Sequence, residues 1–130
     1  MAEPMTVEVV SPERVLYSGE ATQVITRTLG GGEIAFLAGH APFVGALDVC
    51  HTRIYEVDGT VVDMAVHGGF VEVSNNSVAI LSDAAELAGD IDIARAEATK
   101  QWAEDRLRQE PDPEAEDALN RANVRLTAAG

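Results

Sequence analysis

The sequence predicts a mainly β part followed by two α-helices. Between Thr6 and Ser82, apolar and polar residues alternate and many apolar ones are β-branched, a pattern typical of strands with one buried face. After Ser82 the alternation ends, and Ala, Glu, Arg, Lys and Gln prevail, which favours helix. Seven or more short strands cannot each hide one face in a single open layer, so we expect a sandwich or a flattened barrel.

The segments with the strand pattern are separated by turn signals. They are TVEVV, VLYS, TQVITRT, HTRIYEV, TVVDMAV, GFVEVS and SVAILS, and IAFL is also strand-like. Asp58-Gly59 separates the fourth segment from the fifth, and Asn75-Asn76 separates the sixth from the seventh. Both pairs tolerate the positive φ that two-residue hairpin turns need, so we predict a hairpin at each.

Two helices are expected after the strands. The first is capped by Asp90 or Asp92 and runs to Gln109. The segment EPDPE then stops it, because its prolines forbid helical continuation. Pro113 is acceptable in the opening turn of a second helix, which we predict from about residue 114 to 128. We divide the chain into a β-sandwich domain, residues 1–86, and a helical domain, residues 87–130.

Each helix has one stripe of small apolar residues, and the two stripes predict an antiparallel hairpin. The stripe positions are Ala96, Thr99, Ala103 and Leu107 in the first helix and Ala115, Ala118, Leu119, Ala122 and Leu126 in the second. Each buried CH₂ contributes only about 0.8 kcal/mol, so an alanine seam should be weak and the hairpin able to detach. We expect Trp102 to pack in the hairpin; the alternative is a contact with another protein.

The composition excludes several ligand classes. The formal net charge of −13 disfavours nucleic acid and acidic membrane surfaces, since both attract clustered Lys and Arg. Cys50 is the only cysteine, so we expect no internal disulfide. The chain has no run of about 18 apolar residues and no basic or apolar leader, so we expect neither a membrane span nor an export signal.

No pattern predicts a phosphate loop or a metal site. The run Gly30 to Gly32 is followed by Glu33 rather than by Lys and Ser or Thr, which favours a tight turn. The histidines His40, His51 and His67 have no Cys or His at ligand spacing, which argues against zinc. We expect each histidine to be hydrogen-bonded or to face solvent.

An active site is equally unsupported. His40 can be drawn with Asp48 into a triad, but no nucleophile motif accompanies them. The favoured interpretation is a non-catalytic component of an assembly. The alternatives are a freestanding β-sandwich binding module and a hydrolase that uses His40.

Three blocks carry a family resemblance. GGEIAFLAGHAPFVGAL, HGGFVEVSNNSVAILSDAAE and DIDIARAEATK resemble, in order and spacing, the epsilon subunits of bacterial F-type ATP synthases. The resemblance implies a ten-stranded sandwich and a movable helical hairpin. It also implies a rotor component that links the gamma subunit to the c ring and couples proton translocation to ATP synthesis. Such a subunit lies on the cytoplasmic face of the plasma membrane, held there only through the complex.

The resemblance also assigns two groups of residues. The acid after the glycines and the GHAP turn would contact the c ring; here these are Glu33, His40, Ala41 and Pro42. The IDIARA motif would bind ATP as a regulatory ligand, with no cofactor required. The corresponding residues are Glu86, Ile91, Asp92, Arg95, Ala96, Arg121 and Arg125. The alternative is that Asp92 only caps the helix and Arg95 forms a surface salt bridge.

The extended hairpin of the family contacts the alpha and beta subunits and restrains ATP hydrolysis. Basic side chains of its second helix meet an acidic loop of the beta subunit. This chain offers only Arg121 and Arg125 there, so we expect modest attraction and weak inhibition. In addition, Trp102 stands in a stretch where ATP-binding members tend to carry a further arginine.

Overall fold

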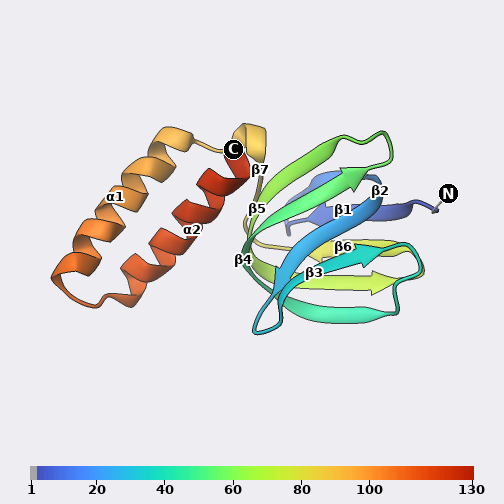
Figure 1. Ribbon diagram of the computed structural model, residues 1–130, viewed down its shortest axis with the longest axis horizontal. Coiled ribbons are helices and arrows are strands. Elements are labelled where there is room, and N and C mark those ends of the chain that lie inside the picture. The colour runs from blue at the N-terminus through green and yellow to red at the C-terminus, as the bar shows by residue number, and fades with distance from the viewer. Residues whose placement is uncertain (1–2) are drawn as a thin grey trace.

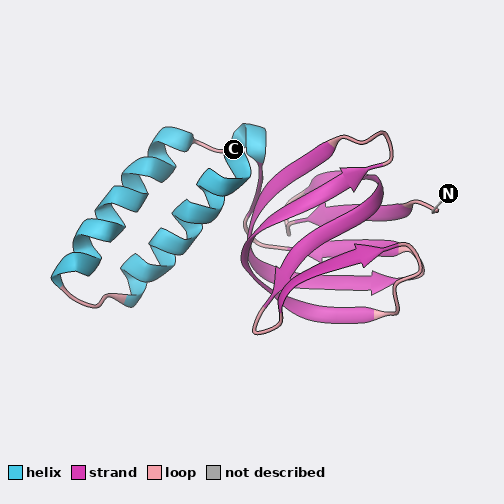
Figure 2. Cartoon of the chain, in the orientation of Figure 1, coloured by secondary structure: helices cyan, strands magenta, loops and turns pink. Residues whose placement is uncertain are grey.

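Strands and helices occupy separate halves of the chain in the computed structural model, which describes residues 3–130 (Figures 1 and 2). The strands are β1 (Met5–Val10), β2 (Val15–Thr28), β3 (Gly32–Leu37), β4 (Phe43–Glu56), β5 (Val61–Ser74), β6 (Ser77–Leu81) and β7 (Ala85–Leu87). A 3-10 turn, Ala88–Asp90, leads to the helices α1 (Ile93–Gln109) and α2 (Pro113–Ala129). The predicted combination of a β part and a two-helix hairpin is confirmed.

The sheet closes on itself. Its hydrogen-bonded order is β1-β6-β5-β4-β2-β3, and β1 also pairs with β2. The β1–β6 pair is parallel and the other pairs are antiparallel. Closure leaves β3 and β7 as short additions and protects most strand edges from pairing with other chains. The result is the expected flattened barrel or sandwich.

The strand number differs from the family expectation of ten, since residues 3–130 form seven hydrogen-bonded strands. The reason is that β2, β4 and β5 each span 14 residues. β2 pairs with β1 through its first half and with β3 through its second. β5 likewise pairs first with β7 and then with β6, and bends at Gly68 and Gly69. Each long strand thus replaces two shorter ones, including the separately predicted TVVDMAV and GFVEVS.

Both predicted hairpin turns are present. Asn75 and Asn76 have φ of 51° and 58° between β5 and β6, and Gly59 has φ of 92° between β4 and β5. The Asp58 carboxylate accepts a hydrogen bond from the Thr60 backbone N–H at 2.9 Å. Side-chain chemistry at the turns therefore agrees with the register of the strands they connect.

The core of the sandwich is built mainly from valines and other aliphatic side chains, with one aromatic ring. Its largest fully buried members are Phe36, Met5, Leu47, Ile54, Met64, Ile80, Val7, Val9, Val24, Val66, Val71 and Val78. Two buried threonines, Thr26 and Thr52, share a hydrogen bond of 2.9 Å, and Thr26 lies 3.3 Å from the Cys50 sulfur. The buried polar groups at this place are therefore paired, as a stable core requires.

An aspartate caps each helix; the cap of α1 was predicted as Asp90 or Asp92, and that of α2 was not predicted. Asp92 caps α1 by accepting the Arg95 backbone N–H at 3.0 Å, and Asp112 caps α2 by accepting the Glu114 N–H at 3.0 Å. Arg106 donates to Asp112 at 2.9 Å and so ties the end of α1 to the start of α2. Neither helix is long and apolar enough to cross a membrane, over the part of the chain that is described.

Small side chains form the helix seam. Ala103, Ala115 and Ala118 are buried between the helices, with Leu107 and Leu119 packed against them. Trp102 lies outside this seam with 51% of its surface exposed, so the expected packing role is wrong. The reason is angular, because a helix turns by about 100° per residue and Trp102 points away from the direction of its neighbour Ala103.

The hairpin rests on the sandwich through the C-terminal half of α2, while α1 lies on the outer side of α2 (Figure 1). Ala128, together with Val124 and Ala129, packs against Ala65 and Ile91. These are mostly small side chains, so the apolar part of this contact is limited. The hairpin is therefore attached at one end and projects from the sandwich.

Substitution of Gly69 tests whether the bend in β5 requires a glycine. Its φ is +112°, and a Cβ there would clash with the Leu81 carbonyl oxygen. We expect Gly69→Ala to lower the free energy of unfolding by about 3 kcal/mol or more, since backbone would have to move. Gly59→Ala is the control: φ is +92° but the space is open, so only strain of about 1–2 kcal/mol applies. If urea unfolding shows that the two variants lose the same free energy of unfolding, the prediction is contradicted.

Candidate functional site

A cavity of about 470 Å³ lies where the hairpin meets the sandwich. Its lining comes from β7, the 3-10 turn, the first half of α1 and the middle of α2. The lining residues are Glu86, Asp90, Asp92, Arg95, Ala96, Thr99, Ala118, Arg121 and Arg125. The small side chains of Ala96, Thr99 and Ala118 leave room between α1 and α2.

Six of the seven residues assigned to nucleotide by the motif line this cavity. They are Glu86, Asp92, Arg95, Ala96, Arg121 and Arg125. The seventh, Ile91, is 8% exposed and packs against Ala65 and Ala128. Ile91 therefore joins the hairpin to the sandwich, and whether ATP binds in the cavity stays a prediction.

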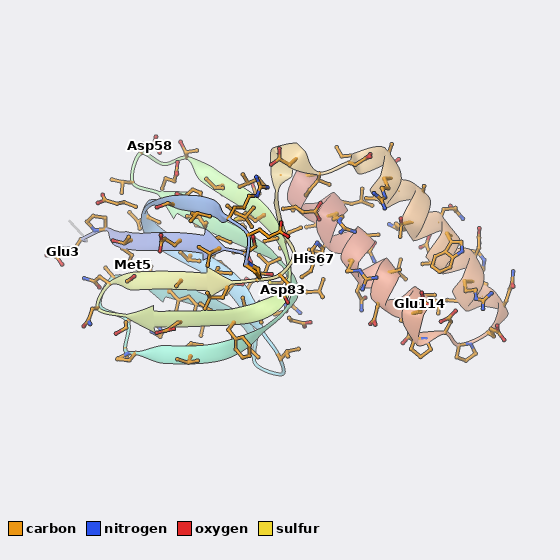
Figure 3. All side chains as sticks on the ribbon, turned by 180° about the vertical axis from the view of Figure 1, so that it is seen from behind. Glu3, Met5, Asp58, His67, Asp83 and Glu114 are labelled. Atoms are coloured by element: carbon orange, nitrogen blue, oxygen red, sulfur yellow. The ribbon has the colours of Figure 1, made fainter. Side chains whose placement is uncertain are left out.

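Glu86 is the polar joint between the two parts of the molecule. Its Oε1 accepts a hydrogen bond from Arg125 Nε of α2 at 2.6 Å and lies 3.0 Å from His67 Nε2 of β5. Figure 3 shows His67 at the junction of the sandwich and the helices. Burial alone would raise the pKa of Glu86, but hydrogen bonds from Arg125 and His67 outweigh it and hold that pKa below its ordinary value.

His67 is hydrogen-bonded, one of the two states expected for it, but its partner Glu86 was not predicted from the sequence. The His67 side chain is 4% exposed, and no partner for Nδ1 exists among residues 3–130. Burial lowers the pKa of His67; the hydrogen bond to Glu86 opposes this, and the positive charges of Arg125 and Arg121 add to the lowering. No local signal could have found the contact, because the two partners stand 19 residues apart.

Two of the three cavity arginines have no ionic partner in the described part of the chain. Arg125 is paired with Glu86, whereas Arg95 and Arg121 form no salt bridge there. The surface salt bridge considered for Arg95 is thus not found, while Asp92 does cap the helix. Two unpaired guanidinium groups facing one cavity favour binding of a ligand with several negative charges.

The cavity has further lining residues that the motif did not include. Thr99 follows Arg95 by four residues and Ala118 precedes Arg121 by three, so both share a helix face with a predicted residue. Helical spacing could have found them. No group of three or more His, Cys, Asp or Glu side chains within the described residues is placed to hold a metal ion.

The residues expected at the c ring lie at two separate places. Glu33 begins β3, and its Oε2 lies 3.1 Å from an Arg53 guanidinium nitrogen. His40, Ala41 and Pro42 follow the other end of the six-residue strand β3, whose course from Glu33 to Leu37 is about 13 Å at roughly 3.3 Å per residue. The two groups of residues therefore lie near opposite ends of one edge strand, and whether they contact the c ring stays a prediction.

The turn that carries His40 is held rigidly. Gly39 has φ of +84°, and its N–H donates to Asn76 Oδ1 at 2.7 Å, which joins this turn to the β5–β6 turn. The His40 ring meets Phe36 edge-on at 4.9 Å between centroids. Asp48 accepts a hydrogen bond from the Val49 N–H at 2.8 Å and forms none with His40 in the described residues. The geometry for a hydrolase triad is therefore missing at His40.

Together, these features define a class: a closed β-sandwich with a loosely attached helical hairpin and an arginine-lined cavity at their junction. Two family models match the chain. The model described as ATP synthase, Delta/Epsilon chain, beta-sandwich domain covers residues 4–88, and the one described as ATP synthase, Delta/Epsilon chain, long alpha-helix domain covers residues 90–130. The chain belongs to the ATP synthase delta/epsilon family, and its role is that of an epsilon subunit.

Epsilon chains of bacterial ATP synthases are similar to this chain in sequence. The chain is 52% identical over 103 residues to the ATP synthase epsilon chain of Brevibacillus brevis, covering 79% of this chain and 77% of that protein. It is 41% identical over 128 residues to the ATP synthase epsilon chain of Streptomyces avermitilis, covering 98% and 97%. The predicted family is confirmed.

Solved structures share the fold. A chain in the mitochondrial ATP synthase of Euglena gracilis matches with a TM-score of 0.84 at 21% identity, covering 98% of this chain and 82% of that one. A chain in the mitochondrial ATP synthase central stalk and c ring of Tetrahymena thermophila matches with a TM-score of 0.60 at 14% identity, covering 99% and 98%. These likenesses support the fold alone.

The lowered pKa of His67 predicts a pH dependence. A histidine whose pKa is lower in the folded protein binds protons more tightly when unfolded, so stability falls as the pH drops below its ordinary value of 6.5. We expect the free energy of unfolding to decrease between about pH 8 and about pH 5.5, and His67→Gln to reduce this decrease. Protonation of Glu86 changes the free energy of unfolding only below its ordinary pKa of 4.5. Urea unfolding at both pH values measures the effect; an identical decrease in the variant would contradict it.

Proposed function

We propose that this protein is the non-catalytic epsilon subunit of a bacterial ATP synthase rotor, whose hairpin position is controlled by ATP. The observation that carries the proposal is the arginine-lined cavity at the junction of the hairpin and the sandwich. A ligand bound there contacts α1, α2 and β7 together. It therefore stabilises the folded-down hairpin over any arrangement in which these elements separate.

The sandwich is the part that links the gamma subunit to the c ring. Glu33 and the turn of His40, Ala41 and Pro42 supply contacts to the polar loops of the c ring. The hydrogen bond from Gly39 to Asn76 and the aromatic contact of His40 support this role. Transmission of torque requires contact residues that are held in fixed positions. Through these contacts the subunit helps couple proton translocation to ATP synthesis, at the cytoplasmic face of the plasma membrane.

The cavity fits the chemistry of ATP. Its volume of about 470 Å³ is that of a small-molecule site. Arg95 and Arg121 supply unpaired positive charge for phosphates, and Arg125 adds a third guanidinium group already in contact with Glu86. Glu86 and Asp92 supply acceptors for hydroxyl or amino groups of a nucleoside. No catalytic step on ATP is proposed, since the cavity lining contains no nucleophile paired with a base.

The released hairpin acts on the catalytic head of the complex. Extended toward the alpha and beta subunits, it restrains ATP hydrolysis. The limited apolar contact between α2 and the sandwich supports this movement, because two arrangements of similar stability need differ by only a few kcal/mol. Arg121 and Arg125 are the basic groups of α2, so attraction to an acidic partner is modest and inhibition weak.

Removal of the second helix tests the inhibitory role. We expect deletion of residues 112–130 to raise ATP hydrolysis by the assembled enzyme, because the movable element is then too short to reach the head. The truncated chain should still copurify with the gamma subunit, since the sandwich is intact. Hydrolysis and copurification are measured on the same membrane preparation. Unchanged hydrolysis would remove the inhibitory role, and failure of the intact chain to copurify would remove the rotor role.

Charge removal tests ATP binding. We expect Arg95→Ala and Arg121→Ala each to weaken ATP binding by about tenfold or more, because each removes a charge-assisted hydrogen bond of about 1.5–3 kcal/mol. Isothermal titration calorimetry on the full chain measures the dissociation constants. Arg108→Ala is the matched control, because this arginine is on α1, pairs with Asp105 and lies outside the cavity. Equal affinity in all three variants and the intact protein would contradict the site.

A further inference from the structure

The His67 ring is buried where the hairpin meets the sandwich (Figure 3). The strand that carries it, β5, pairs with β7 and is in contact with α2. The backbone N–H of His67 donates to the Ala84 carbonyl oxygen at 2.9 Å, which fixes the ring's position on the sandwich. If the hairpin detached, α2 would leave the ring and water would reach it. The two positions of the hairpin therefore give this imidazole two different environments.

The hydrogen bonds around His67 fit a neutral imidazole. An ionised carboxylate can only accept, so the His67 Nε2 that lies 3.0 Å from Glu86 Oε1 carries the ring proton. The other nitrogen, Nδ1, is then a bare acceptor, buried and without a hydrogen-bond partner among residues 3–130. Protonation would turn Nδ1 into a buried N–H donor with no acceptor on a charged ring. Such a group is costly to bury.

The surrounding charges also oppose a positive charge on the ring. The charged groups that act on it are Glu86 from β7 and Arg121 and Arg125 from α2. Its pairing partner on β4, Val49, carries no charge. The Glu86 carboxylate is already used by Arg125, whose Nε lies 2.6 Å from the same oxygen that accepts from the imidazole. A protonated His67 would therefore be a third cation beside one carboxylate.

We propose that His67 is a proton sensor, whose protonation releases the hairpin from the sandwich. On release, α2 removes both arginines from the ring and exposes it to water, so that a proton on Nδ1 is no longer opposed. Protons therefore favour the released hairpin, by the same kind of linkage through which a cavity ligand favours the attached one. The inference rests on the proposed movement of the hairpin and adds a signal that opposes ATP.

Linkage gives the direction and the pH range of the effect. Burial lowers the pKa of His67 from its ordinary value of 6.5 in the attached state; the hydrogen bond to Glu86 opposes this, and Arg125 and Arg121 add to the lowering. The contribution of neutral His67 to attachment is therefore complete above about pH 7.5 and is lost as the pH falls through its ordinary pKa. Glu86 keeps its charge over this range, since its pKa lies below 4.5.

Thiol labelling of a position beneath the hairpin measures its release. Ala65 is fully buried and packs against Ile91 and Ala128, so the thiol introduced by Ala65→Cys reacts with dithiodipyridine only when the hairpin opens. The labelling rate, divided by the rate of the urea-unfolded chain at the same pH, gives the ratio of released to attached hairpin. Cys50 belongs to the sandwich core and reports any opening of the sandwich itself.

We expect this ratio to rise several-fold, up to about tenfold, from about pH 7.5 to about pH 5.5, since release takes up one proton. Adding His67→Gln should abolish the rise, because the amide can donate to Glu86 but does not titrate. His51→Gln is the matched control: this histidine pairs with Asp63 of the sandwich, so the rise should remain. Arg125→Ala removes the ion pair to Glu86 and should raise the ratio at both pH values.

An NMR titration of the His67 ring supports the test without a change of this residue. Ile91→Ala weakens the apolar contact between hairpin and sandwich and alters no charge. In this variant we expect the ring to titrate at a higher pH than in the intact protein, because more of the hairpin is released. An identical titration midpoint in a variant whose thiol labelling shows release would overturn the sensor.

The labelling results separate the sensor from the movement on which it depends. If the ratio does not rise on acidification, or rises equally with His67→Gln, the sensor fails and the movable hairpin stands as long as Arg125→Ala exposes the introduced thiol. If neither acid nor Arg125→Ala exposes it, the hairpin does not detach, and the proposed movement fails together with the sensor. If Cys50 is labelled in parallel with the introduced thiol, acid opens the whole sandwich and the proposed local release is wrong.

Discussion

One shared carboxylate joins the two parts of this molecule. Glu86 accepts from Arg125 of the hairpin and lies within hydrogen-bond distance of His67 of the sandwich, while the apolar contact beside it consists largely of small side chains such as Ala65 and Ala128. Partly burying a carboxylate is costly unless its partners are in place, and removing one partner leaves the charge uncompensated. Loss of either partner therefore destabilises the contact between the hairpin and the sandwich.

In the proposed function, ATP in the cavity adds to this contact between Glu86, Arg125 and His67 rather than replacing it. Because Arg125 is already paired with Glu86, the guanidinium groups left for phosphates are those of Arg95 and Arg121. Arg95 belongs to α1, which has little contact with the sandwich of its own. An anion held by both arginines connects α1 to α2 beside the Arg125–Glu86 ion pair. The folded-down hairpin gains the full binding free energy of the anion only while α1, α2 and β7 stay together.

The sequence predicted what is set locally and missed what depends on distant contacts. Asp92 caps α1 through a hydrogen bond to the Arg95 backbone N–H, three positions away, so the residues near the helix start were sufficient to predict it. The partner of His67 stands 19 residues further along the chain, and the continuity of β5 through Gly68 and Gly69 depends on pairing with other strands. The cavity residues came from a motif resemblance; helical spacing would have added Thr99, but could not give the distance between the two helices.

The small residues between α1 and α2 both weaken the packing of the hairpin and leave the space of the cavity. Ala96 and Ala118 contribute little buried surface, which keeps the hairpin weakly packed, and the same missing volume is the space between α1 and α2 that forms the cavity. Leucines at these positions would add stability by burying more CH₂ groups and would fill the cavity at the same time. A hairpin that binds a ligand between its helices must therefore be marginal without the ligand. In the proposed control by ATP, weak packing between α1 and α2 lets the ligand determine the position of the hairpin, whereas the sandwich is held by its closed sheet and by the Gly39–Asn76 hydrogen bond.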